Sequence, residues 1–214
     1  QVLEDAGFRV IVPRHHLCCG RPLYDQGMLD RAKARLRDVM DVLDPFVAVG
    51  IPIVGLEPSC ILTFRDELPS LFSEDRRAKA IASNSFLLDE FLVREAPDFA
   101  PPELRQKTLL QGHCHQKAIA GIGDEVALLS RAAGANLELL DAGCCGMAGA
   151  FGYDRDHFEI SKTIGERVLF PAIDNAPPDA IIVADGFSCR SQIRHFCPSR
   201  RPMHLAEVMN LRVG

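Results

Sequence analysis

The chain has 214 residues, of which 47% are hydrophobic and 25% are charged. This is the composition of a globular protein and excludes a disordered or fibrous chain. The 24 Lys and Arg against 29 Asp and Glu give a net charge of −5, which argues against binding to nucleic acid. No apolar run reaches the ~20 residues that cross a bilayer, and the N-terminus lacks the basic start and apolar stretch of a signal peptide.

The first part of the chain shows alternating strand and helix signals. In chain order we expect a buried strand over 8–12, a helix over 28–43 that ends at Pro45, a strand over 51–56, a helix that starts near Ser59, and an amphipathic helix over 85–92. The sequence Cys18-Cys19-Gly20 lies between the first strand and the first helix.

The second part repeats this order and adds two elements in front. We expect a strand over 108–112, a helix over 125–133, a buried strand over 137–140, a helix over 157–169, a strand over 180–184, a helix that starts near Ser188, and an amphipathic helix over 204–209. Cys144-Cys145-Gly146 takes the place of the earlier Cys-Cys-Gly run. Because the first part lacks the two leading elements and the chain starts with Gln1, we expect a processed or excised piece of a longer protein.

Strands that alternate with helices predict an α/β fold of two repeated parallel units, with cysteines at the C-terminal ends of the strands. The first unit covers residues 1–96 and is truncated at its N-terminus. The second unit covers residues 106–214. The connection between them contains Pro97, Pro101 and Pro102, as expected for a surface linker.

The eight cysteines carry the strongest functional signal. A chain of this length without an export signal is not a disulfide scaffold, so thiolate metal ligands in a reducing compartment are the better interpretation. Adjacent cysteines are unusual for zinc sites, which favours an iron–sulfur centre. The candidate ligands are Cys114, Cys144, Cys145 and Cys189 in the second unit and Cys18, Cys19 and Cys60 in the first. Cys197 has no counterpart in the first unit and is expected to be an ordinary buried residue.

Several polar neighbours of these cysteines admit more than one role. His113 and His115 would ligate zinc, donate hydrogen bonds to cluster sulfurs, or lie on the surface. Glu57 and Asp185 would stabilise helix starts or contact a partner. Cationic side chains beside the cysteines would stabilise thiolates; these are Arg21, Lys117 and Arg190.

The Cys-Cys-Gly pair in a duplicated unit resembles the CCG-type cysteine-rich domain. The runs that carry the resemblance are Leu17–Leu29, Gly55–Cys60, Gly112–Ala118, Gly143–Tyr153, Ile164–Leu169 and Ala184–Arg190. They are most similar to the C-terminal iron–sulfur region of FAD-linked oxidases and D-2-hydroxyacid dehydrogenases, such as D-lactate dehydrogenase, and to the iron–sulfur subunit of glycolate oxidase. Heterodisulfide reductase subunits end each unit in Cys-x-x-Cys, whereas this chain has Thr63 and Gln192 at the last position.

The resemblance implies an electron-transfer region of an FAD-dependent oxidoreductase that acts on D-lactate, glycolate or D-2-hydroxyglutarate. Cys114, Cys144, Cys145 and Cys189 would hold one 4Fe-4S cluster, whereas the three cysteines of the first unit, Cys18, Cys19 and Cys60, would hold a degenerate or labile site or no metal. FAD would lie in the missing N-terminal part of the parent chain. Electrons would pass from that flavin-binding domain to a quinone or cytochrome. The implied location is the cytoplasm, with peripheral association at the inner membrane as an alternative.

Two other functions remain open from the residues. A zinc-stabilised structural or docking domain would be colourless and sensitive to chelators. A thiol–disulfide redox domain would use one cysteine as nucleophile and its neighbour as the resolving thiol. The fragment alone is not expected to oxidise a hydroxyacid, because no Gly-rich dinucleotide loop follows its strands.

Overall fold

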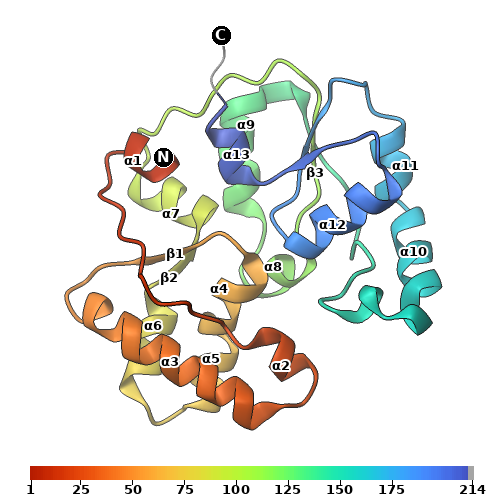
Figure 1. Ribbon diagram of the computed structural model, residues 1–214. Coiled ribbons are helices and arrows are strands. Elements are labelled where there is room, and N and C mark those ends of the chain that lie inside the picture. The colour runs from red at the N-terminus through yellow and green to blue at the C-terminus, as the bar shows by residue number, and fades with distance from the viewer. Residues whose placement is uncertain (212–214) are drawn as a thin grey trace.

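The computed structural model describes residues 1–211 and contains two parallel sheets surrounded by helices (Figure 1). The first sheet pairs β1 (Ile53–Gly55) with β2 (Ser85–Leu87). The second sheet has the order β4-β3-β5-β6, with all neighbours parallel. Its strands are β3 (Thr108–Leu110), β4 (Leu137–Leu139), β5 (Ile181–Val183) and β6 (Pro202–Met203). The predicted α/β class with parallel sheets is confirmed.

Helices of the first unit surround its small sheet; those between residues 21 and 83 form the lower lobe in Figure 1, and those at 2–5 and 88–95 lie above it. The helices of this unit are α1 (Val2–Asp5), α2 (Arg21–Asp25), α3 (Leu29–Val47), α4 (Pro58–Arg65), α5 (Glu67–Leu71), α6 (Arg76–Ser83) and α7 (Leu88–Glu95). The longest, α3, buries one apolar stripe at helical spacing, which includes Leu36, Val39, Met40 and Leu43. This stripe packs against α6 and fixes the base of the lobe.

Helices of the second unit follow its strands in turn. They are α8 (Cys114–Ile119), α9 (Gly123–Ala133), α10 (Phe158–Glu166), α11 (Leu169–Asp174), α12 (Phe187–Phe196) and α13 (Leu205–Met209). Three short 3-10 turns, η1 (Gly134–Asn136), η2 (Phe151–Tyr153) and η3 (Arg155–His157), fill the connections on either side of β4. None of the helices within residues 1–211 is long and apolar enough to cross a membrane.

The predicted strand over 8–12 is wrong: these residues run as coil, and Val10, Ile11 and Val12 are exposed. The matching segment of the second unit is β4, which exists because it pairs with β3. In the described part of the first unit, β1 pairs only with β2, so residues 8–12 have no strand to join. A strand needs a partner for its backbone groups, and an apolar run alone does not supply one.

Other element boundaries also differ from the prediction. Helix α3 runs two residues beyond Pro45, since a proline in the last turn removes only one helical hydrogen bond. The predicted helix over 85–92 begins as β2 and becomes helical only at Leu88. The predicted helix over 157–169 is two helices, α10 and α11, with a break around Val168.

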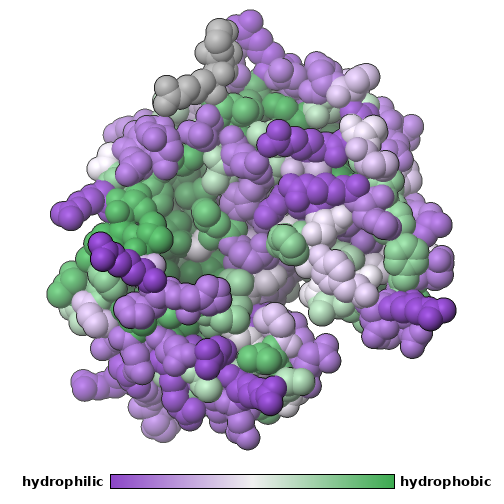
Figure 2. Space-filling model, in the orientation of Figure 1, coloured by the Kyte–Doolittle hydropathy of each residue, from purple (hydrophilic) through white to green (hydrophobic). Residues whose placement is uncertain are grey.

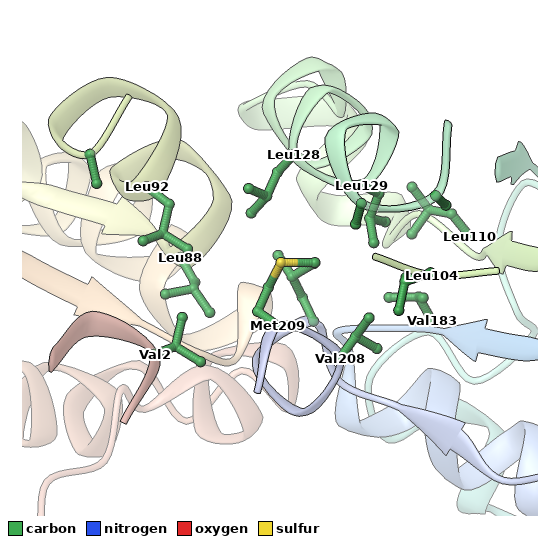
Figure 3. Close-up of a cluster of buried hydrophobic side chains, with 14 residues drawn as sticks. Val2, Leu88, Leu92, Leu104, Leu110, Leu128, Leu129, Val183, Val208 and Met209 are labelled. Atoms are coloured by element: carbon green, nitrogen blue, oxygen red, sulfur yellow. The ribbon is translucent and has the colours of Figure 1, made fainter. Parts of the chain in front are cut away.

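A shared hydrophobic cluster joins the two units (Figure 3). Leu88 and Leu92 of α7 face Leu128 of α9 and Val208 of α13. All four side chains are at most 2% exposed. The units therefore share this cluster in addition to the buried cluster that each has of its own, and the shared contacts hold the units together beside the site described next.

Candidate metal centre

A cavity of about 710 Å³ lies between the two units, and six of the seven candidate ligand cysteines line it. These are Cys19 and Cys60 of the first unit and Cys114, Cys144, Cys145 and Cys189 of the second. The seventh, Cys18, is exposed and does not line the cavity. Figure 2 shows the surface indented between the lobe that carries α2 and the lobe that carries α10. All eight cysteines, including the buried Cys197, are free.

Strand ends deliver the second unit's cysteines to this cavity. Strand β3 leads to Cys114, the first residue of α8, and β5 leads to Cys189 near the start of α12. Strand β4 leads into the loop that carries Cys144 and Cys145. β4 and β5 lie on opposite sides of β3. The connection from β3 to β4 therefore runs across the sheet in one direction, and the connection from β4 to β5 runs in the other. Such a switch point is where parallel sheets bind ligands.

The first unit contributes by a similar route. Strand β1 leads to Cys60, the third residue of α4, as β5 leads to Cys189. Cys19 comes from the coil before α2, and Gly20 follows it with φ of 78°. A Cβ at Gly20 would approach the carbonyl oxygen of Ala32 at 3.1 Å. Glycine at this position therefore lets the Cys19 loop lie close against α3.

Two pairs of cysteine sulfur atoms lie within hydrogen-bonding distance of each other. The Sγ atoms of Cys19 and Cys60 are 3.2 Å apart, and those of Cys114 and Cys144 are 4.0 Å apart. The hydrogen bond between the two sulfur atoms lowers the pKa of Cys19 to about 7 and raises that of Cys60. The hydrogen bond from Cys114 lowers the pKa of Cys144 in the same way. In each pair, one thiol therefore ionises more readily than an ordinary cysteine, and the thiolate is the form that ligates a metal.

The Cys144-Cys145 loop is fixed by polar contacts that sequence reasoning missed. Gly146 has φ of 102°, and a Cβ there would collide with the carbonyl oxygen of Ser161. The backbone N–H of Gly146 donates to Cys144 Sγ at 3.3 Å. The side chain of Gln192 donates to the carbonyl oxygens of Cys145 and Ser161 at 3.1 and 3.2 Å. Gln192 therefore positions the loop that carries Cys144 and Cys145.

His113 and His115 both line the cavity, and His113 is only 6% exposed, which excludes the surface alternative for that side chain. Burial lowers the pKa of His113 to about 4, so its ring is neutral at physiological pH. Its Nε2 lies 3.4 Å from Ser59 Oγ, and its buried Nδ1 has no hydrogen-bond partner within residues 1–211. His113 therefore contributes a neutral ring to the wall of the cavity.

Glu57 connects the two units at the rim of the cavity. It precedes α4, yet its carboxylate accepts a hydrogen bond at 2.8 Å from the backbone N–H of Phe187, the first residue of α12. Burial raises the pKa of this carboxyl group. A residue of the first unit thus caps a helix of the second unit, and the helix dipole favours the charge there.

Asp185 and His204 make the complementary connection. Asp185 Oδ1 accepts from the N–H of Leu205 at 2.7 Å at the start of α13. His204 Nδ1 accepts from Ala206 N, which leaves Nε2 to donate to the carbonyl oxygen of Leu56 in the first unit at 2.6 Å. These contacts lie next to β1 and β5, so they fix the two cysteine-bearing strand ends relative to each other.

The three cationic side chains contact backbone and carboxylates. Lys117 Nζ donates to the carbonyl oxygen of Ala142 at 2.9 Å, and Arg190 donates to that of Ala184 at 2.8 Å. Arg21 lines the cavity and forms ion pairs with Asp25 and Glu67. Lys117 and Arg190 therefore brace the cysteine loops, while Arg21 carries a positive charge at the wall.

Taken together, the donor set fits an iron–sulfur centre. Soft thiolates converge from five segments on a cavity with room for an inorganic group. Cys197 is excluded from this set because it does not line the cavity and lies, 1% exposed, in the apolar core of the second unit. This agrees with its prediction as an ordinary buried residue.

Comparison with known proteins places this geometry in context. The family model of the cysteine-rich CCG domain matches residues 1–65 and 112–194, more than half of the chain. The chain is 28% identical over 197 residues to one of the subunits of anaerobic glycerol-3-phosphate dehydrogenase of Escherichia coli, a match that covers 90% of this chain and 49% of that protein. It is 31% identical over 192 residues to D-2-hydroxyglutarate dehydrogenase of Pseudomonas putida, which covers 89% of this chain and 18% of the relative.

A third relative has a similar length. Lactate utilization protein A of Bacillus subtilis is 26% identical over 223 residues, which covers 99% of this chain and 90% of the relative. The chain thus spans about half of the matched glycerol-3-phosphate dehydrogenase polypeptide and under a fifth of the hydroxyglutarate dehydrogenase. The relatives named as dehydrogenases associate this domain type with oxidoreductases.

Proposed function

The chain belongs to the cysteine-rich CCG domain family, and from that premise we propose that it is the iron–sulfur electron-transfer region of an FAD-linked 2-hydroxyacid dehydrogenase. The observation that carries the proposal is the convergence of six free cysteines from both units on one cavity. When bound, a 4Fe-4S cluster supplies one-electron transfer. Candidate ligands are these six cysteines, with exposed Cys18 as a seventh.

The surrounding residues suit this role. Gly146 and Gln192 hold the Cys144-Cys145 loop in one conformation, which limits structural change when the charge of the site changes. Tyr153 and Phe187 line the cavity and are each 58% exposed. Part of the cavity wall is therefore exposed at the surface, where an acceptor such as a quinone or cytochrome can approach.

The substrate and the flavin are proposed from the relatives. Two of them are named for the dehydrogenation of D-2-hydroxyglutarate and of glycerol-3-phosphate, and a third for the use of lactate. We infer that a D-2-hydroxyacid, such as D-lactate, glycolate or D-2-hydroxyglutarate, transfers a hydride to FAD in a flavin-binding domain of the same parent chain. Electrons then reach the cysteine cavity and leave to the acceptor.

The first test is iron and acid-labile sulfide analysis of the full chain purified without oxygen, together with its visible spectrum. We expect a brown protein with about four iron and four sulfide for one centre, or about eight of each for two. Zinc without sulfide would overturn the electron-transfer proposal in favour of a structural zinc domain. Metal-free protein with rapid thiol–disulfide exchange would overturn it in favour of a thiol redox domain.

A matched pair of variants tests the ligand assignment. Cys145→Ser removes a thiol that lines the cavity, so iron and colour should be lost. Cys197→Ser removes an equally buried thiol outside the cavity, so iron per folded chain should stay unchanged. Equal iron content in the two variants would contradict the assignment. The same measurement on Cys18→Ser decides whether the exposed seventh cysteine takes part.

A further inference from the structure

Asp66, Glu67 and His115 form a second cluster of metal-binding side chains beside the cysteine cavity. One oxygen of each carboxylate and one ring nitrogen of His115 all lie within 4.8 Å of one another. Asp66 and Glu67 lie at the junction of α4 and α5 in the first unit, and His115 is the second residue of α8 in the second unit. The cluster therefore spans the contact between the two units.

Glu67 is buried without full compensation of its carboxylate. Its side chain is 8% exposed, and Oε1 pairs with Arg21. Oε2 is buried and has no hydrogen-bond partner within residues 1–211. Burial raises the pKa of Glu67 despite the nearby guanidinium. An unpaired buried carboxylate oxygen is costly, and a bound cation would remove that cost.

The local charge also matches a dication. Arg21 pairs with Asp25 and Glu67, and the carboxylate of Asp66 lies close enough to raise the pKa of Glu67, so three carboxylates stand against one guanidinium. The excess is two negative charges. Asp66 is exposed and makes no ion pair in the part of the chain that the structure describes, so one side of the cluster is open to water. Two carboxylates, one imidazole and an open side are the features of a divalent transition-metal site.

We propose that Asp66, Glu67 and His115 bind one divalent transition-metal ion, separate from the cysteine thiolates. The ion would join α5 of the first unit to α8 of the second and so fix the helix that carries Cys114. This site goes beyond the proposed electron transfer, because it needs no iron–sulfur cluster and none of the cysteines.

Mn²⁺ is the probe that separates the two sites. It favours oxygen and nitrogen ligands and competes poorly for thiolates. The full chain, purified without oxygen and treated to remove loosely bound metal, is titrated with Mn²⁺ while electron paramagnetic resonance follows the free ion. We expect one Mn²⁺ per chain and a rise in the unfolding temperature with Mn²⁺ concentration.

Asp66→Asn and His115→Asn should each weaken Mn²⁺ binding at least ~10-fold and abolish the thermal shift. Asp66 is exposed, so its variant keeps the fold. Glu74→Gln removes an exposed carboxylate elsewhere in the first unit and should bind Mn²⁺ as the unmodified chain does. Absence of Mn²⁺ binding in the unmodified chain, or equal affinity in all variants, would overturn the proposal. Iron content measured in parallel reports on the cysteine cavity independently.

Discussion

Three carboxyl groups lie buried near the contact between the units, and two of them, Asp89 and Glu125, each have an oxygen without a hydrogen-bond partner within residues 1–211. Asp89, Glu125 and Asp185 are at most 4% exposed. The side-chain amide of Gln116 donates to Asp89 at 3.2 Å and to Glu125 at 3.1 Å. Burial is the main cause that raises the pKa of all three, that of Asp89 to about 7. These side chains favour the protonated form, because a charge there would be desolvated and would repel its neighbours.

Asp89→Asn should change how stability depends on pH. The pKa of Asp89 is about 7 in the fold and about 3.9 when unfolded. The raised pKa therefore adds its full contribution to the free energy of unfolding below pH ~4, and this contribution is lost as the pH rises through ~7. Asn cannot ionise and can still accept from Gln116. We expect the variant to be more stable at pH 8, by up to about 4 kcal/mol, and the difference to shrink toward pH 4.

Urea unfolding of both proteins at half-unit steps between pH 4 and pH 8 measures this difference. A parallel dependence on pH in the two proteins would mean that Asp89 is ionised in the fold throughout this range.

At the scale of elements, the loop after β4 depends on one glycine. Gly146→Ala imposes a left-handed conformation on alanine, at a cost of ~1–3 kcal/mol, and also places a methyl group against the carbonyl oxygen of Ser161. We expect lower stability and partial loss of iron, because Cys144 and Cys145 must shift. Gly121→Ala is the matched control: its φ is 84° and a Cβ there meets nothing within 4 Å. It should show only the conformational cost and keep its iron.

Thermal unfolding and iron analysis of the two variants separate strain from collision. Iron loss of the same size in both would contradict the structural role assigned to the Gly146 contact.

The sequence predicted elements well where local pattern and pairing agree. Strands β3 and β5 lie within the predicted ranges, because each apolar run has a parallel neighbour on both sides. The run at 8–12 has the same local pattern but no strand beside it, so pairing, which lies outside the local sequence, overrode propensity. The short strand β2 was missed because Ser85–Leu87 is in phase with the helix that follows it.

For the candidate site too, the sequence predicted what depends on local pattern and missed what depends on contacts between distant segments. The repeat predicted that cysteines would gather at one edge of each unit, and six of them line the cavity. What the repeat could not predict is that the two edges face each other, since packing between units depends on α7, α9 and α13. Gln192 was missed as a positioning residue, because its partner Ser161 is far away in sequence.

At the scale of the whole molecule, the two units share one hydrophobic cluster, while each also has a buried cluster of its own. The limits 1–96 and 106–214 remain a prediction, and the shared cluster around Leu92 and Leu128 bears on how they behave. Residues 106–214 expressed alone should retain helical structure but lack fixed packing in this cluster, because Leu128 and Val208 would lose Leu88 and Leu92 and become exposed. Binding of a hydrophobic dye and poor dispersion in NMR spectra would report this state.

Leu92→Ala in the full chain provides the comparison, with an expected loss of ~2–5 kcal/mol for a fully buried leucine. Cooperative unfolding of the isolated residues 106–214, with dispersed spectra, would show instead that the second unit is self-sufficient.

Each unit provides a hydrogen-bonding side chain to the other, and these two contacts limit which substitutions the chain can accept. Glu57 completes a helix of the second unit, and His204 donates to a carbonyl group of the first. Although the two units repeat one pattern, neither is an interchangeable module. Replacement of one unit by that of a distant relative would leave a helix start uncapped and a carbonyl group without its donor. Inherited substitutions on one side of the cavity are therefore constrained by the other side, and the duplicated units must diverge as a matched pair.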